Sequence, residues 1–277
     1  MTENFEEFRR KHDYVVCFDS DGTVLDAMSV KHNHCHGPAF IEVWGLTDHA
    51  DEVQALWNRI NLYESTRGIN RFLALDLILR QLDGILLQER ELPILEAWLR
   101  DSPAHTDAEL EKAIARCPCE ILKKARQFSK RVNERISALS PKDKPVFKGV
   151  FEAFRKVRRE ADLAVVSSSN RSAIMEEWGY YGLLDYVDMM TSLETGSKSE
   201  CLRKLVGCGY DPANVLMVGD ALQDRDAAAA NGTGYYQIVP RHEEESWAAF
   251  PAFLDRFLHG DPAEEEEQEE APVALSV

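Results

Sequence analysis

Residues 14–23 read Tyr14-Val15-Val16-Cys17-Phe18-Asp19-Ser20-Asp21-Gly22-Thr23, and this stretch decides the fold. Its first half is apolar and β-favouring, and it ends abruptly in two carboxylates and a glycine. A short apolar run closed by a turn signal is typical of a buried strand. Acids at the carboxyl end of such a strand lie where an open α/β sheet binds its ligands. The stretch therefore predicts the first strand of an α/β sheet, with functional acids at its tip.

The two acids of this stretch are close in sequence. Asp19 and Asp21 stand two residues apart, so on a strand both side chains would point the same way. Like charges held that close repel each other, and they persist only where a cation neutralises them or one of them keeps a proton. Gly22 permits a tight turn just beyond them, and Thr23 adds a hydroxyl. The alternative is an ordinary solvent-facing turn, since Asp and Gly are common turn residues.

Composition narrows the class of protein. With 277 residues, of which 44% are hydrophobic, the chain can form one large domain or two small ones. The net charge of −16 argues against a nucleic-acid partner bound through its phosphates. The sequence lacks an apolar run long enough for a membrane span and an apolar secretion signal, and its cysteines are scattered. We therefore expect a cytoplasmic protein with reduced thiols and no membrane partner.

The segment after Thr23 is helical in pattern. Apolar residues recur at helical spacing from about residue 28 to residue 139, and strand patterns are nearly absent there. Two apolar sets each fall on one helical face: Val53, Leu56, Trp57 and Ile60, and Phe72, Leu75, Leu79 and Leu82. Such a segment is too long for a connecting loop. We predict an all-helical domain over residues 27–144, inserted after the first strand.

From residue 149 onward, strand patterns alternate with helical ones. Strands are predicted at 163–166, 186–190, 215–218 and 235–239, and helices at 150–160, 172–178, 198–206, 224–230 and 247–258. This alternation predicts a Rossmann-like parallel sheet with helices on both faces, a three-layer α/β/α core built from residues 1–26 and 145–260. Residues 261–277 form an acidic tail that we expect to be disordered.

Polar residues also follow the later strands. Ser167 and Ser168 come after the strand at 163–166, where hydroxyls and backbone N–H groups could hold an anion or cap the next helix. Lys198 begins a helix after a glycine turn. It is either a cation suited to a phosphate or an ordinary surface lysine.

A second pair of acids lies at a later strand end. Asp220 follows the strand at 215–218 after Gly219, and Asp224 begins the next helix, which it could also merely cap. Carboxylates that converge from separate strand ends form an oxygen-rich site of the kind that Mg²⁺ prefers. Together with Asp19 and Asp21 they predict a metal site beside an anion cradle.

The order of these residues resembles the four motifs of the haloacid dehalogenase-like (HAD) hydrolase superfamily. The matching residues are Asp19-Ser20-Asp21-Gly22-Thr23, Ser167, Lys198, and Gly219-Asp220 with Asp224. The resemblance covers about residues 14–26 and 149–240, and the helical insertion is similar to the type-1 cap of that superfamily. It implies that Asp19 is the nucleophile and that Asp21 is the general acid and then the base.

The resemblance also implies the binding residues and the reaction. Phosphate would be held by Ser167, Ser168, Lys198, Gly22 and Thr23. Mg²⁺ would be bound by the Asp19 carboxylate, the Asp21 backbone carbonyl and Asp220, with Asp224 in support. The implied function is a Mg²⁺-dependent phosphatase that hydrolyses a small phosphorylated metabolite through an aspartyl-phosphate. The acid at Asp21 favours this chemistry, because the superfamily's dehalogenases and phosphonate-cleaving members lack it. A sugar phosphomutase and a catalytically silent, protein-binding member stay open as alternatives.

Substrate choice should lie in the helical insertion, which would close over the strand tips. His32 and His36 stand one helical turn apart, where they could contact substrate, pack, or bind a metal. Arg67 and Arg71 belong to a polar stretch between two helical patterns. They could meet an anionic part of the substrate, or they could form a solvated turn.

Overall fold

The computed structural model describes residues 1–259, so the predicted acidic tail lies outside the described residues. Its centre is β1 (Tyr14–Phe18), in a five-stranded sheet whose strands run in the order β3-β2-β1-β4-β5. All neighbouring strands pair in parallel, and Val16 lies opposite both Leu163 and Leu216. The other strands are β2 (Ala161–Val166), β3 (Met189–Thr191), β4 (Val215–Gly219) and β5 (Gly234–Gln237).

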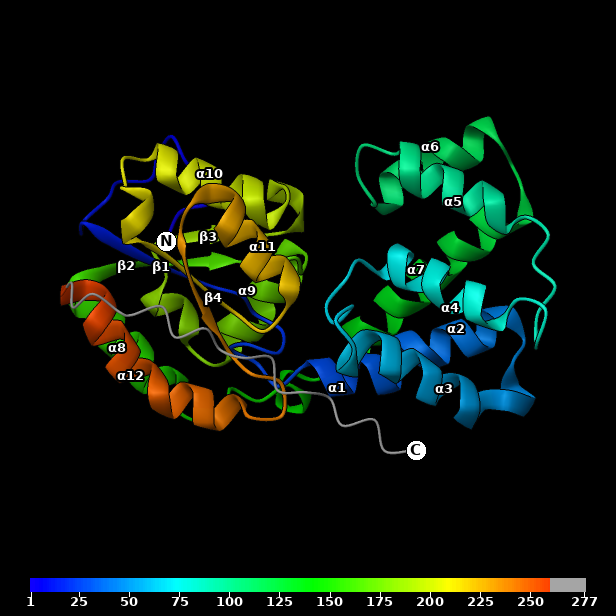
Figure 1. The fold of residues 1–277 in the computed structure, drawn as a ribbon, viewed down its shortest axis with the longest axis horizontal. Helices are drawn as coiled ribbons and strands as arrows, with labels where there is room; N and C mark the ends of the chain where they lie inside the picture. The colour runs from blue at the N-terminus through cyan, green and yellow to red at the C-terminus, as the bar shows by residue number, and fades with distance from the viewer. Residues whose placement is uncertain (260–277) are drawn as a thin grey trace.

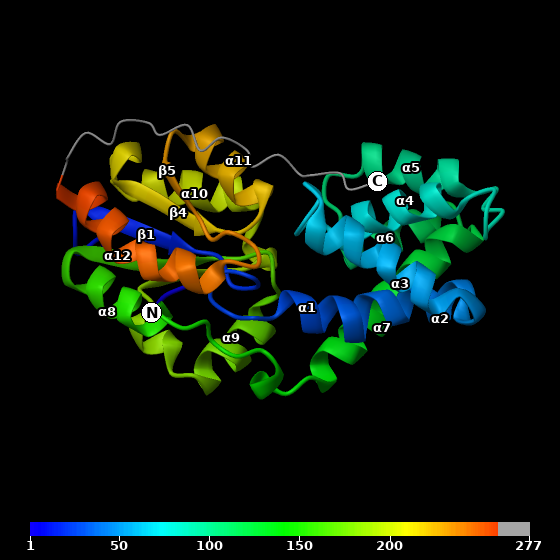
Figure 2. The ribbon, with the colours of Figure 1, turned by 60° about the horizontal axis from the view of Figure 1, so that its bottom comes forward.

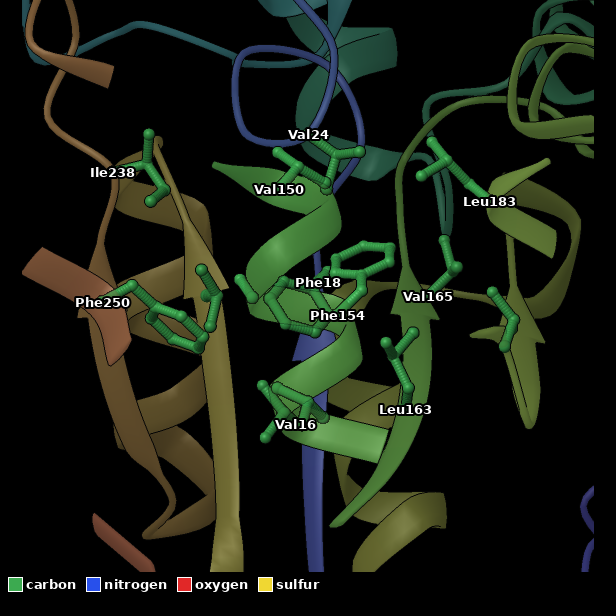
Figure 3. Close-up of a cluster of buried hydrophobic side chains, with 14 of the residues drawn as sticks. Val16, Phe18, Val24, Val150, Phe154, Leu163, Val165, Leu183, Ile238 and Phe250 are labelled. Atoms are coloured by element: carbon green, nitrogen blue, oxygen red, sulfur yellow. The ribbon is translucent and has the colours of Figure 1, made fainter. Parts of the chain in front are cut away.

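Helices cover both faces of this sheet (Figures 1 and 2). On one face, Val16 and Phe18 pack with Phe154 and Phe250 in a cluster shown in Figure 3. That face is covered by α8 (Val150–Glu160), α9 (Arg171–Tyr180) and α12 (Glu243–His259). Alternate residues of β1 face the other way, toward α10 (Lys198–Gly207) and α11 (Leu222–Asn231). A strand buried on both faces explains why β1 is apolar throughout.

The chain leaves the sheet after β1 and forms a lobe of helices before it returns at β2 (Figure 1). The helices are α1 (Met28–Lys31), α2 (Gly37–Trp44), α3 (Ala50–Asn58), α4 (Arg71–Leu82), α5 (Leu92–Asp101), α6 (Asp107–Arg116) and α7 (Glu120–Ala138). They enclose an apolar cluster of their own, which includes Trp57, Phe72 and Phe128. We call this lobe the helical unit. The predicted fold class is therefore confirmed, whereas the boundaries at 27 and 144 stay predictions.

The two segments that join the helical unit to the sheet run side by side. Leu25 forms an antiparallel bridge with Val146, and the Asp26 N–H donates to the Pro145 carbonyl at 2.8 Å. A short turn (Pro141–Asp143) precedes the returning segment. The outgoing connection begins just after Asp19 and Asp21, and the returning connection pairs with it. Both connections therefore lie near the carboxyl end of β1.

The predicted elements differ from the observed ones mainly at their edges. The helix predicted at 150–160 is observed at those residues, whereas the strand predicted at 186–190 is only Met189–Thr191. The reason is a 3₁₀ turn (Leu183–Tyr186) that takes up the start of that apolar run. Within residues 1–259, no helix combines the length and apolar character needed to cross a membrane. The cytoplasmic location stays a prediction.

Candidate active site

Three carboxylates meet at the carboxyl edge of the sheet. Asp19 directly follows β1, Asp220 follows β4, and Asp224 lies in the first turn of α11. Because β1 and β4 are neighbours, their tips bring these side chains together, with one oxygen of each within 4.8 Å of the others. All three are buried, and theirs is the one group of three or more metal-capable side chains found among residues 1–259.

Lys198 lies between two of these carboxylates. Its Nζ is 3.0 Å from Asp19 Oδ2 and 2.5 Å from Asp224 Oδ1. It is the first residue of α10, which begins with a capping box between Ser197 and Glu200. The side chain is only 8% exposed, so Lys198 is not a surface lysine. Asp224 also accepts the Ala221 N–H at 3.1 Å, and it therefore caps α11 as well as binding Lys198.

The three carboxylates are crowded and buried, which disfavours their ionised forms. Burial, with smaller contributions from Asp224 and Asp220, raises the pKa of Asp19 to about 8 against the opposing charge of Lys198. Burial and Asp220 likewise raise the pKa of Asp224. Burial disfavours the charged form of Lys198, but Asp19 and Asp224 outweigh it and raise the pKa of the ammonium. A set of crowded oxygen donors that resists ionisation is well suited to a hard divalent cation.

Asp21 lies past the end of β1 and has a different partner. Both of its oxygens accept from Lys31 Nζ, at 2.7 and 2.6 Å, and Oδ2 also accepts from Ser169 Oγ at 3.1 Å. Burial opposes its ionisation, but the charge and hydrogen bonds of Lys31 outweigh that effect and lower the pKa of Asp21. Asp19 and Asp21 therefore pair with different cations: Asp19 with Lys198 of α10, and Asp21 with Lys31 of α1.

The glycine and the threonine of the first loop shape the carboxylate cluster. Gly22 has a φ of +83°, and a Cβ there would lie 2.5 Å from Asp220 Oδ2. Only glycine allows the backbone to come so close. Thr23 is buried, and its hydroxyl donates to Asp220 Oδ1 at 3.1 Å. In this geometry the Thr23 hydroxyl orients Asp220.

The serines after β2 lie beside the first loop. Ser167 is buried, and its Oγ accepts the Ser169 N–H at 3.1 Å, whereas Ser168 is exposed. Helix α9 is capped by the next residue, Asn170, whose side chain accepts the Ala173 N–H. Within the polar stretch after β2, helix capping is thus done by Asn170.

One arginine of the helical unit reaches the carboxylate cluster. Arg67 Nε donates to Asp220 Oδ2 at 2.6 Å, and its Nη1 donates to the Leu62 carbonyl at 3.2 Å. Arg71 instead lies within the helical unit, where its Nη1 donates to Asn133 Oδ1 at 2.6 Å and to Ser129 Oγ at 3.1 Å. The two arginines of one polar stretch thus have different surroundings.

The two histidines stack on each other beside Trp57. Their ring centroids are 4.6 Å apart, and His32 Nδ1 accepts from Trp57 Nε1 at 3.0 Å. His36 Nδ1 donates to the Lys31 carbonyl at 3.1 Å. Burial lowers the pKa of both rings, with that of His32 at about 3. For the pKa of His32, the charge of Arg67 acts in the same direction as burial, and the charge of Asp21 opposes them.

Sequence reasoning did not identify Lys31 or Ser169 as residues of the site. Both contact Asp21 directly. Lys31 directly precedes His32, and Ser169 directly follows Ser168. Their polar side chains and their positions beside predicted site residues were the signals by which they could have been found.

Comparison with known proteins assigns the family. A family model described as haloacid dehalogenase-like hydrolase matches residues 15–232, whereas no curated protein matches the chain. A solved haloacid dehalogenase-like hydrolase from Streptococcus pneumoniae is 12% identical, with a TM-score of 0.50 over 87% of this chain and 98% of its own. A HAD phosphatase from Thermococcus onnurineus is 19% identical, with a TM-score of 0.42 over 81% of this chain and 85% of its own.

A protein from Thermotoga maritima, described as a β-phosphoglucomutase, is also similar. It is 18% identical, with a TM-score of 0.47 over 86% of this chain and 99% of its own. The Streptococcus pneumoniae structure resembles the chain in fold. The family model spans most of the chain and includes the loop after β1, Lys198 and both later acids. The chain therefore belongs to the haloacid dehalogenase-like hydrolases and is an enzyme of that family.

Proposed function

We propose that this hydrolase is a Mg²⁺-dependent phosphatase that acts on a small soluble phosphomonoester through an aspartyl-phosphate. The observation that carries this proposal is the environment of Asp19. This carboxylate lies at the tip of the central strand, 3.0 Å from Lys198 and within 4.8 Å of oxygens of Asp220 and Asp224. Phosphoryl transfer needs positioning and charge neutralisation above all, and this arrangement offers both.

The carboxylate cluster fits a divalent cation. Asp19, Asp220 and Asp224 supply converging oxygens. Burial, together with the charges of Asp224 and Asp220, raises the pKa of Asp19, so the ionised carboxylate would gain from a cation. By resemblance, the Asp21 carbonyl would complete the ligand set. When bound, Mg²⁺ would lessen the repulsion between the Asp19 carboxylate and the phosphate dianion.

Asp19 and Asp21 then divide the chemistry. An Asp19 oxygen forms a bond to phosphorus while the bond from phosphorus to the leaving oxygen breaks. Asp21, in its protonated form, which Lys31 disfavours in the free enzyme, gives that oxygen a proton. Water next attacks the phosphorus of the aspartyl-phosphate, Asp21 takes a proton from it, and the Asp19 carboxylate is regenerated. Lys198 and Ser167 would hold the phosphate through both steps.

The contacts between the two lobes support a small substrate. Arg67 touches Asp220, and a Cβ on Gly68 would lie 3.0 Å from Ala221 Cβ. Nearby, the Arg241 guanidinium lies 4.5 Å from the ring centroid of Tyr63. The helical unit thus covers the strand tips closely, which favours a small metabolite over a protein substrate.

A phosphate-release assay tests this proposal. The wild type is incubated with 4-nitrophenyl phosphate and with a panel of phosphorylated metabolites, in Mg²⁺ or in EDTA. We expect Mg²⁺-dependent release of free phosphate and its loss in Asp19→Asn. The matched control is Asp26→Asn, the same change at an exposed position in the same segment. Turnover that survives both EDTA and Asp19→Asn would overturn the mechanism.

The same assay separates the alternatives. A phosphate moved to another position of the same sugar, without release, would indicate a phosphomutase. A wild type that turns over no phosphoester in the panel would indicate a catalytically silent protein.

A further inference from the structure

A chain of buried charged side chains extends from Asp21 toward the helical unit. Lys31 Nζ contacts both Asp21 oxygens and lies 3.5 Å from Glu177 Oε1. The same Glu177 oxygen accepts from Lys144 Nζ at 2.6 Å. Lys31, Glu177 and Lys144 are all buried, at 5%, 1% and 2% exposure. Charges buried this deeply are costly unless they are paired, so these side chains are held by one another.

The members of this chain come from three different segments. Lys31 ends α1 on the outgoing connection, and Lys144 follows the short turn on the returning connection. Glu177 belongs to α9, which packs on the sheet. Through Lys31 and Lys144, Glu177 therefore contacts both connections. These connections pair with each other through Leu25 and Val146, close to the loop that carries Asp19 and Asp21.

The distances indicate that Lys31 pairs mainly with Asp21 and only secondarily with Glu177. Glu177 already has Lys144 at 2.6 Å, whereas Lys31 stands 3.5 Å from it. Lys31 makes its shorter contacts, 2.7 and 2.6 Å, with the two oxygens of Asp21. Ser169 Oγ approaches Asp21 Oδ2 as well, at 3.1 Å. The carboxylate is therefore held at both oxygens, and its rotation is restricted.

We propose that Lys31 is a positioning residue for the proton transfers of Asp21. This inference rests on the proposed function, in which Asp21 gives a proton to the leaving oxygen and later takes one from water. The helical unit supplies the ammonium that fixes the Asp21 carboxylate, and Glu177 fixes the ammonium. A proton donor and acceptor must lie within hydrogen-bond reach of the reacting oxygen, so its orientation affects both steps.

A double-mutant cycle tests this role. Lys31→Met, Asp21→Asn and the combined variant are compared with the wild type on phenyl phosphate and 4-nitrophenyl phosphate. A residue that acts only through Asp21 has nothing left to lose once Asp21 has been changed. We expect Lys31→Met to lower kcat on phenyl phosphate by about tenfold or more, with KM changed less than about threefold. In the Asp21→Asn background, we expect Lys31→Met to lower kcat on phenyl phosphate by less than about twofold.

The two substrates supply a second readout. 4-Nitrophenolate leaves more easily than phenolate and depends less on a proton from Asp21. Lys31→Met should therefore slow phenyl phosphate more than 4-nitrophenyl phosphate, a difference that general loss of structure would not produce. Lys142→Met is the control, because Lys142 is an exposed lysine of the same returning connection. It should leave the ratio of the two rates unchanged within about twofold.

The outcomes separate this inference from the proposed function. If Lys31→Met costs the same with and without Asp21, or if it mainly raises KM, the positioning role is wrong while the phosphatase stands. If the wild type hydrolyses neither ester, both proposals fall. Where Lys31→Met does not fold, Lys31→Arg replaces it in the cycle, since it keeps the charge but alters the contact with Asp21. The same non-additivity is then expected, and its absence overturns the role.

Discussion

Arg67 of the helical unit donates from Nε to Asp220 Oδ2 at 2.6 Å, and Thr23 holds the other oxygen of that carboxylate. A guanidinium thus lies against one of the three carboxylates suited to a divalent cation. The guanidinium and a divalent cation would compete for the same carboxylate oxygens. The helical unit and a bound cation would therefore be linked through Asp220.

Removal of the Arg67 charge should strengthen metal binding. In Arg67→Met, a divalent cation no longer meets a competing guanidinium at Asp220. We expect the affinity for Mg²⁺, measured by calorimetry without substrate, to rise by about threefold to tenfold, or about 1 kcal/mol. Unchanged or weaker affinity would mean that Arg67 and the cation do not compete.

Arg71→Met is the control for this change. Arg71 lies four residues further along, and its contacts go to Ser129 and Asn133 inside the helical unit. We expect its loss to leave the metal affinity unaltered and to lower the free energy of unfolding by about 1–3 kcal/mol, because buried partners lose their hydrogen bonds.

Metal binding should release a proton from Asp19. Without a cation, burial and the neighbouring acids raise the pKa of Asp19 to about 8, so the carboxyl is mostly protonated at neutral pH. A divalent cation binds the ionised form. We therefore expect about one proton released per cation at pH 7 and almost none above about pH 9. Calorimetry at pH 7 in buffers of different ionisation enthalpy measures this number directly.

The direction in which metal affinity changes with pH gives a second check on the protonation of Asp19. Because protons compete with the cation, the apparent affinity should rise with pH until about pH 8 and then level off. An affinity that is flat between about pH 6 and pH 8 would contradict a protonated Asp19. Asp19→Asn should lose both the proton release and most of the affinity.

The sheet and most of the proposed motif residues could be predicted because their signals are local. The apolar run before Asp19 is buried on both faces, so it is recognisable without its neighbours. Asp19, Ser167 and Asp220 follow such strands, and Lys198 and Asp224 lie in the first turns of helices. Parallel topology brings the strand ends to one edge. The fold class therefore follows from periodicity and order alone.

The contacts of the helical unit could not be predicted in the same way. Nothing in the sequence distinguishes Arg67, which reaches Asp220, from Arg71, which stays inside the helical unit. Ser20, uninformative in sequence, is buried and accepts from Trp178 Nε1 at 2.9 Å, across more than 150 residues. Such partners are chosen by the packing of distant elements, which one sequence does not reveal.

His32 should make stability depend on pH. The pKa of the folded ring is about 3, against 6.5 for the free side chain. Between these values the unfolded chain binds a proton that the folded chain does not, so the free energy of unfolding decreases as pH falls through 6.5. At about pH 5 this contribution amounts to about 2 kcal/mol. Urea denaturation at pH 5 and pH 7.5 measures it.

Two asparagine variants isolate the His32 contribution. His32→Asn keeps an acceptor for the Trp57 Nε1–H group but does not titrate, so it should lose that share of the pH dependence. His34→Asn changes an exposed histidine in the same turn and should leave the pH dependence as it is. Equal pH dependence in the wild type and His32→Asn would show that the ring is already protonated, or free to become so.

A methyl group on Gly22 should weaken metal binding, beyond any effect that it has on the stability of the fold. Gly22→Ala places a Cβ 2.5 Å from Asp220 Oδ2 at a φ of +83°, so the loop must shift or Asp220 must turn away. Gly84→Ala is a close control, because Gly84 has a φ of +76° with nothing within 4 Å of the new Cβ. Both should lose about 1–2 kcal/mol of stability to backbone strain. Only Gly22→Ala should also lose tenfold or more in Mg²⁺ affinity, which calorimetry on the folded variants measures. If both bind Mg²⁺ as the wild type does, the close approach of this loop to Asp220 does not matter for the site.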